Sequence, residues 1–125
     1  RYILRLTFWA KLRGLAAIVI DGGSRDLDET RVMGFPLFVR HSLPVTGRRR
    51  VRVVATHIPI RLDGIDVAPG DILVGDDTGV VRIPCSAITE VAARAAIIDA
   101  RDRRVRELIE SGVGFTEAFR QASKS

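Results

Sequence analysis

An arginine and an aspartate that follow two glycines are the residues of this sequence best suited to chemistry. They are Arg25 and Asp26, and the glycines Gly22 and Gly23 separate them from an apolar run at 16–20. Glycine lets a backbone turn sharply and approach a ligand closely. In open α/β sheets, ligands bind beyond the carboxyl ends of the strands. We therefore predict a binding site here, with both glycines next to the substrate.

The side chains of this Arg-Asp pair predict a particular chemistry. Arginine offers a planar fork of donors that matches a carboxylate, and aspartate is a hard oxygen ligand for Mg²⁺ or Mn²⁺. Together they could hold an α-keto acid, with Arg25 on its carboxylate or carbonyl oxygen and a metal on Asp26 polarising that carbonyl. Breaking the next C–C bond would give an enolate that both charges stabilise. A local ion pair or a helix cap is the alternative interpretation, and it stays open.

The elements that must position this pair follow from periodicity and from turn residues. Turn chemistry at 21–23 is expected to end the first strand, Ser86 is expected to cap the long helix, and residues 76–79 are typical of a hairpin turn. The order predicts an α/β fold with a mixed sheet and a long C-terminal helix. The predicted helices span residues 3–11, 27–33, 87–110 and 116–122, and the predicted strands span 16–20, 35–40, 51–55, 58–61, 72–74 and 80–83.

Length and composition set the outer bounds. The 125 residues fit one domain, and the 46% hydrophobic content with 28% charged residues is typical of a globular protein. The single cysteine, Cys85, excludes an internal disulfide and fits a cytoplasmic location. No apolar run approaches the roughly 20 residues of a membrane span, so no membrane partner is expected.

Other charged clusters have simpler interpretations. Three acids, Asp71, Asp76 and Asp77, could form a second metal site, but acids in such turns usually accept hydrogen bonds from their own backbone. The arginines at 48–52 contribute to the net charge of +5, yet they lack nearby aromatic stacking partners, so a solvated loop is favoured and nucleic acid is an unlikely partner. His57 has no paired acid in sequence and is interpreted as structural.

Four ordered motifs carry a resemblance to a known family. They are residues 14–26 (GLAAIVIDGGSRD), 34–38 (GFPLF), 59–71 (PIRLDGIDVAPGD) and 75–84 (GDDTGVVRIP), and the long helix with Gly112 and a short helix follows them. At this spacing, from about residue 13 to residue 123, the sequence resembles the RraA-like family. That family comprises metal-dependent pyruvate aldolases and their non-catalytic relatives.

The resemblance implies both a fold and an activity. The fold would be a compact α/β/β sandwich related to swivelling phosphohistidine domains, formed by a single domain over residues 1–125 and assembled as a homotrimer. The activity would be cleavage of 4-hydroxy-4-methyl-2-oxoglutarate-type keto acids to pyruvate, with decarboxylation of oxaloacetate besides. Arg25 would bind substrate and stabilise the enolate, and Asp26 would be the ligand of Mg²⁺ or Mn²⁺.

The sequence departs from the family at its beginning. Active members carry a glycine-rich loop with an acidic residue upstream of the Arg-Asp pair, whereas residues 1–13 contain no Gly, Asp or Glu. We therefore expect either a fragment of a longer protein or a degenerate member. If degenerate, the chain would be a non-catalytic regulator that binds a protein partner such as a ribonuclease, and this alternative to the lyase stays open.

Overall fold

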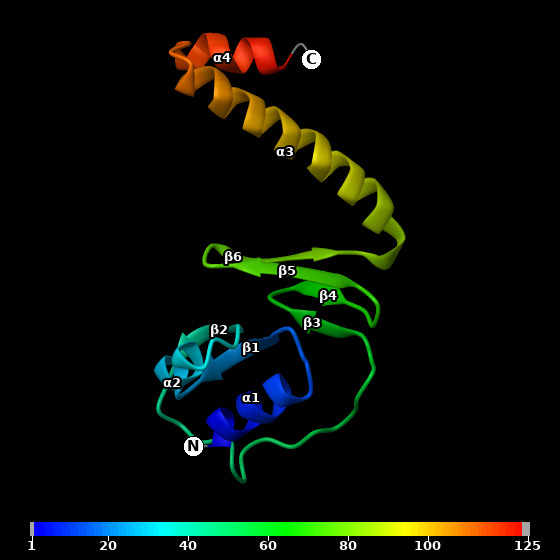
Figure 1. Cartoon of the computed structure of the whole chain (residues 1–125). Helices are drawn as coiled ribbons and strands as arrows, with labels where there is room; N and C mark the ends of the chain where they lie inside the picture. The colour runs from blue at the N-terminus through cyan, green and yellow to red at the C-terminus, as the bar shows by residue number, and fades with distance from the viewer. Residues whose placement is uncertain (1, 124–125) are drawn as a thin grey trace. The chain divides into compact units, whose positions relative to one another are not determined.

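A computed structural model describes the backbone of residues 2–123 and the side chains of residues 5–123. The chain forms two compact units, Arg1–Arg82 and Ile83–Ser125 (Figure 1). The prediction of a single domain stays a prediction. Among the described residues, no helix combines the length and apolar character that crossing a bilayer requires.

The first unit begins with alternating helices and strands that deliver the Arg-Asp pair. Helix α1 (Tyr2–Leu12) leads into strand β1 (Ile18–Ser24), helix α2 (Leu27–Val32) follows, and strand β2 (Leu37–Ser42) then pairs in parallel with β1. The α2 crossover is short, so the two parallel strands are neighbours in both sequence and space. The side chains of Ile18 to Ile20 are half-buried.

The expectation that the glycines end the first strand was wrong. Strand β1 continues through Gly22 and Gly23 to Ser24, and its register with β2 shifts between Ile20 and Gly23. The flexible glycines are accommodated as a β-bulge, in which one strand carries an extra residue. The chain therefore bends inside the ladder instead of leaving it.

Two short hairpins follow. Strands β3 (Ile60–Leu62) and β4 (Ile65–Val67) pair in antiparallel fashion. The two-residue turn between them has φ of 48° at Asp63 and 76° at Gly64. Positive φ at both positions is the twist-matched geometry of tight hairpins. Strands β5 (Ile72–Asp76) and β6 (Gly79–Ile83) form the other pair, as predicted around residues 76–79.

The predicted strand at 51–55 was wrong. These residues have no regular secondary structure, and Val51, Val53 and Val54 are about four-fifths exposed. Their β-branched side chains favour extended backbone, but propensity alone does not form a strand without a pairing neighbour. The preceding Arg48–Arg50 segment is an exposed turn, as predicted.

The second unit is helical. A 3-10 turn, η1 (Cys85–Ala87), leads into the long helix α3 (Ile88–Glu110), and α4 (Phe115–Ala122) packs back on it. The small core of this unit consists of Val105, Leu108, Ala118 and Ala122, with Val113 packed against it. The predicted cap was wrong, because η1 precedes α3 and Ala87 is its N-cap residue.

The α/β class and the long C-terminal helix are confirmed. Parallel and antiparallel pairs are both present, but within residues 2–123 they form three two-stranded sheets and not the one mixed sheet that was predicted. The tight turns leave only three residues in each of β3 and β4, which limits the ladder they can extend. The compact sandwich stays a prediction.

Candidate functional site

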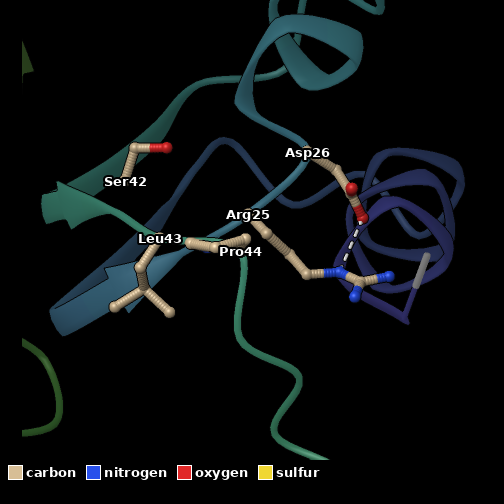
Figure 2. A pocket seen from close by; sticks show the side chains of 5 residues that line it. All are labelled: Arg25, Asp26, Ser42, Leu43 and Pro44. Atoms are coloured by element: carbon tan, nitrogen blue, oxygen red, sulfur yellow. Dashed lines mark hydrogen bonds and ion pairs between the residues drawn. The ribbon is translucent and has the colours of Figure 1, made fainter.

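A pocket of about 460 Å³ lies at the carboxyl end of the parallel strand pair. Its lining residues are Arg25, Asp26, Ser42, Leu43 and Pro44. Figure 2 shows the two charged side chains extending together on one side, with Ser42 and Leu43 on the other side. The pocket therefore combines an ionic wall with a largely apolar one.

Parallel pairing explains why residues distant in sequence meet here. Ser24 on β1 is in register with Ser42 on β2, and the Leu43 N–H donates to the Ser24 carbonyl at 2.9 Å. The carboxyl ends of parallel strands lie at one edge of a sheet, so the residues that follow each strand become neighbours. Arg25 follows β1 and Leu43 follows β2, and together they form opposite parts of the pocket.

The Arg25 and Asp26 side chains form an ion pair. The Arg25 Nε donates to Asp26 Oδ2 at 3.2 Å, and the side chains are 25% and 17% exposed. The local ion pair left open by the sequence is therefore present. Asp26 also occupies the N-cap position of α2, although its side chain makes no cap hydrogen bond. The Asp26 carboxylate is thus directed to Arg25 and not to the helix.

The backbone of Asp26 adopts a conformation that few residues tolerate. Its φ of 60° and ψ of 33° are left-handed, which costs most L residues energy, whereas Asp and Asn are more tolerant. The start of α2 holds this geometry, because the Asp26 carbonyl accepts from the Thr30 N–H at 3.1 Å and from the Thr30 hydroxyl at 2.9 Å. Thr30 is 1% exposed and Ser24 is 2% exposed, so the residue just before the pair and the α2 residue that bonds to Asp26 are both buried.

The side chains that could bind a metal at this pocket suit an ion that needs few protein ligands. Among the described residues, no three His, Cys, Asp or Glu side chains gather closely enough to share a metal. Mg²⁺ commonly binds through one or two carboxylates and keeps several waters, with substrate oxygens completing its shell. A single half-buried carboxylate at Asp26, beside a pocket with room for water and substrate, fits that mode. A single carboxylate does not fit a structural zinc site, which needs four protein ligands.

The two glycines lie upstream of the pocket. Gly22 and Gly23 are in β1 and are not among the lining residues. Gly23 is closely packed, since a Cβ there would lie 2.1 Å from Leu43 Cδ2 and 2.8 Å from His41 Cδ2. Their contact with substrate stays a prediction, and in the structure the absence of a Cβ at Gly23 leaves room for the Leu43 side chain.

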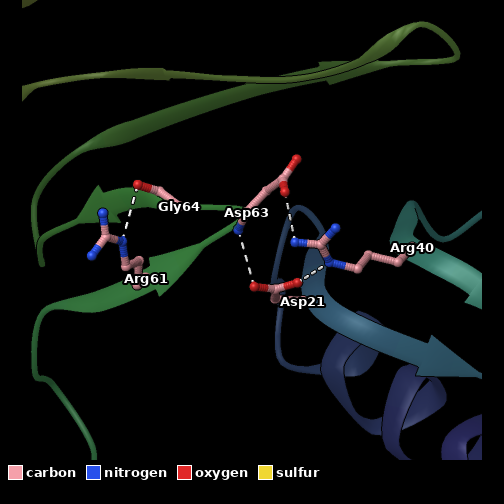
Figure 3. Close-up of polar contacts among 5 residues, drawn as sticks. All are labelled: Asp21, Arg40, Arg61, Asp63 and Gly64. Carbon is pink, nitrogen blue, oxygen red and sulfur yellow. Dashed lines mark hydrogen bonds and ion pairs between the residues drawn. The ribbon is translucent and has the colours of Figure 1, made fainter.

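Sequence reasoning missed three of the five residues that line the pocket. Ser42, Leu43 and Pro44 have unremarkable residue types, but they lie just beyond the second predicted strand at 35–40. Had that strand been paired in parallel with the first, its end would have indicated them. It also missed a cluster on the two strands that lead to the pocket and on the β3–β4 turn, in which Arg40 contacts the carboxylates of Asp21 and Asp63 (Figure 3).

The remaining candidates lie outside the pocket. Asp71 accepts from the Ala68 N–H at 2.8 Å, and Asp76 accepts from the Thr78 N–H at 2.8 Å, as the turn interpretation predicted. The Thr78 hydroxyl and then its N–H hold the pKa of Asp76 below the usual range. His57 is exposed in an irregular bend and does not line the pocket.

Comparison with known proteins gives a family and several relatives. A family model described as "RraA-like: Aldolase/RraA" matches residues 5–82. An uncharacterized protein of Methanocaldococcus jannaschii is 34% identical over 82% of the chain. A protein of Halalkalibacterium halodurans, provisionally named 4-hydroxy-4-methyl-2-oxoglutarate aldolase, is 30% identical over 88% of the chain.

A solved structure is also similar to this chain. The crystal structure of an uncharacterized protein from Pseudomonas syringae pv. tomato has a TM-score of 0.85 and 34% identity over 90% of the chain. The chain spans about half the length of these proteins, namely 49% and 52% of the two sequence relatives and 56% of the solved chain. The match therefore covers one part of each longer relative.

Proposed function

This chain belongs to the RraA-like family, and from that premise we propose that it is a divalent-metal-dependent lyase. Its substrates would be 4-hydroxy-4-methyl-2-oxoglutarate-type keto acids, cleaved to pyruvate, with oxaloacetate decarboxylation as a side activity. The observation that carries the proposal is the half-buried Arg25–Asp26 pair in the pocket at the end of β1. The provisional name of the Halalkalibacterium halodurans relative agrees with it.

Arg25 supplies a permanent positive charge to this chemistry. Its Nε donates to Asp26, and a guanidinium carries further N–H donors beyond Nε for a ligand. In both reactions the C3–C4 bond, one bond removed from the C2 carbonyl, breaks, and its electrons form the C2–C3 enolate of pyruvate. The C4 fragment leaves as a second keto acid once its hydroxyl has lost a proton, or as CO2 from oxaloacetate, and protonation of the enolate at C3 gives pyruvate. A guanidinium held beside the C2 oxygen stabilises the developing charge more than the neutral ground state, which is the requirement for catalysis.

Asp26 would hold the metal. A carboxylate that is 17% exposed and already oriented by Arg25 and by the left-handed backbone loses little freedom on binding an ion. When bound, Mg²⁺ or Mn²⁺ supplies Lewis-acid polarisation of the keto-acid carbonyl. Asp26 thereby acts as the ligand, and Arg25 acts on the substrate oxygens.

The opposite wall is largely apolar. Leu43 and Pro44 present apolar surface to the same pocket. Ser42 lines the same side of the pocket as Leu43 and carries a hydroxyl (Figure 2). The keto-acid carboxylate and carbonyl would face the ionic side, and the remainder of the substrate would face the apolar side.

The assembly is also a proposal. A homotrimer is what the family resemblance implies, and the chain spans only about half of its relatives. We propose that the complete pocket uses further residues, either from a neighbouring copy or from the part of the longer relatives that this chain does not match.

Pyruvate release by point variants tests the proposal. We expect Arg25→Ala and Asp26→Ala each to lower the metal-dependent release from 4-hydroxy-4-methyl-2-oxoglutarate by at least about 100-fold, the usual cost of losing a transition-state contact. Asp28→Ala and Arg31→Ala are matched controls, because they break a pair on α2 whose side chains are 95% and 81% exposed. Controls as inactive as the site variants, or site variants as active as the wild type, would refute the assignment.

A further inference from the structure

A cluster of three charged residues ties together two strands and one hairpin turn of the first unit. Arg40 on β2 donates through Nε to Asp21 on β1, and through Nη2 to Asp63 Oδ1 at 2.7 Å (Figure 3). Asp63 lies in the β3–β4 turn, and its N–H donates to Asp21 Oδ2 at 3.0 Å. Each residue thus contacts the other two, although they come from sequence positions up to 42 residues apart.

The cluster lies at the bulge of β1. Ile20 is in register with Val39, and Gly23 is in register with His41. Between these two pairs, β1 has Asp21 and Gly22, whereas β2 has only Arg40. Arg40 and Asp21 are therefore the residues that face each other across the irregularity, and their ion pair spans it.

A bulge decides where the following side chains point. It bends the strand and re-aims the residues beyond it, and a slip of one residue would turn each of them to the opposite face of the sheet. The residues beyond this bulge are Gly23 and Ser24, followed at once by Arg25 and Asp26. Ser24 is 2% exposed, so the observed register buries it while it delivers the charged pair to the pocket.

We propose that Arg40 is a positioning residue for the Arg25–Asp26 site: by bridging Asp21 and Asp63 it holds the bulge in the register that aims this pair. Arg40 is not among the residues that line the pocket, so it acts through the strand and not on a ligand. The inference rests on the proposed function for its kinetic consequence, but its structural consequence is independent of any activity.

Two features support this assignment. The hydrogen bond from Arg40, followed by the one from the Asp63 N–H, holds the pKa of Asp21 below its usual range, so the folded state favours the ionised carboxylate that Arg40 contacts. The side chains are also partly exposed, at 46% for Arg40, 31% for Asp21 and 83% for Asp63. Exposed ion pairs contribute little to global stability, so removing this one is expected to alter local geometry in a folded protein.

The first experiment measures that geometry directly. Backbone amide resonances and hydrogen exchange would be compared in the wild type, Arg40→Met, Arg40→Lys and Arg61→Met. Arg61 is the matched control, because its Nε donates to the Gly64 carbonyl and its ion pair is with Asp66, so its contacts stay within the β3–β4 hairpin (Figure 3). We expect Arg40→Met to shift the amides of residues 24–26 and to speed exchange of the Leu43 amide at least tenfold. Arg61→Met should leave both unchanged.

Arg40→Lys separates positioning from loss of fold. It keeps the charge, but one ammonium does not reproduce the planar fork that joins two acids, so we expect smaller shifts in the same residues. Unchanged amides at 24–26 in both Arg40 variants would overturn the proposal. The same shifts in Arg61→Met would also overturn it, because the effect would then belong to the hairpin as a whole.

The second experiment measures turnover in the pyruvate-release assay. A displacement of about 1 Å can cost on the order of 100-fold in rate. We therefore expect Arg40→Met to lower kcat at least tenfold with KM changed less than threefold, and Arg40→Lys to recover part of kcat. Shifted amides with an unchanged kcat would overturn the positioning role. If the folded wild type itself releases no pyruvate, the proposed function fails, and the amide comparison alone decides whether Arg40 sets the bulge.

Discussion

Asp26 combines a charged side chain with a left-handed backbone, and these two properties can be tested separately. Asparagine tolerates this backbone as aspartate does, whereas a β-branched side chain does not. We expect Asp26→Asn to change the free energy of unfolding by less than about 1 kcal/mol, the usual size of a partly exposed ion pair. Asp26→Val should lower it by a further 1–2 kcal/mol or so. Urea denaturation measures both, and equal losses in the two variants would contradict the backbone argument.

Asp21 should make the stability of the first unit depend on pH. Its pKa is lowered from 3.8 in the folded protein, first by the hydrogen bond from Arg40. A lowered pKa means that the folded state favours the ionised form. This contribution is present above pH 3.8 and is lost as the pH falls through the lower folded value.

The measurement for this prediction is denaturant unfolding at several pH values. We expect Asp21→Asn to be slightly less stable than the wild type at pH 7, as is usual for a partly exposed ion pair, and the difference to shrink steadily below about pH 4. Asp66→Asn is a suitable comparison, since Asp66 is 82% exposed in a long ion pair of 3.7 Å. A difference between wild type and Asp21→Asn that stays constant from pH 7 to pH 3 would exclude the Arg40 contact as its cause.

At the scale of single residues, the sequence indicated Arg25 and Asp26 but not the cluster that Arg40, Asp21 and Asp63 form. Both are adjacent in the chain and follow a recognisable strand. Arg40, Asp63 and Asp21 meet through contacts 19 to 42 residues apart. Their types and spacing carry no local signal, because the contact exists only once the strands have paired.

Among the elements, β1 depends on a glycine beneath the pocket wall. A Cβ on Gly23 would lie 2.1 Å from Leu43 Cδ2 and 2.7 Å from Leu43 Cγ. Gly23→Ala must therefore displace Leu43, and we expect it to lower the free energy of unfolding by about 1–3 kcal/mol, as overpacking does. Gly22→Ala is the matched control, because the contact nearest its Cβ is Ile20 Cγ2 at 3.8 Å. Equal denaturation midpoints for the two variants would contradict this packing.

Elements with strong local signals were predicted well, and the others were not. The long helix α3 and the hairpin turn at residues 76–79 follow from periodicity and from turn chemistry, which act within a few residues. The bulge in β1 and the absence of a strand at 51–55 depend on which neighbours are available. Tertiary pairing overrides propensity in such cases, so one sequence could not decide them.

At the scale of the whole molecule, the second of its two units has a small core that single substitutions can test. Leu108 is 9% exposed and packs against Ala118 and Ala122 of α4. Leu108→Ala leaves a cavity that typically costs about 2–5 kcal/mol, so we expect exchange of the α4 amides to accelerate at least about 30-fold. Ile97→Ala on the same helix removes a side chain that is 70% exposed and should have little effect. Similar acceleration in both variants would contradict the assigned core.

The family was recognisable from sequence because its motifs recur in order over most of the chain. The extent of the functional unit was not, since the chain spans about half of its relatives. Residue chemistry describes a site locally, whereas the surfaces that complete a pocket depend on the whole assembly.

Metal dependence of pyruvate release is the measurement that tests the central claim most directly. Oxaloacetate would be incubated with the wild-type chain and Mg²⁺ or Mn²⁺, with and without excess chelator, and the release caused by the metal alone would be subtracted. We predict release that the chelator abolishes and that added metal restores. Equal release in the presence of chelator, or none by the folded chain with either metal, would contradict a metal-dependent lyase at the Arg25–Asp26 pocket.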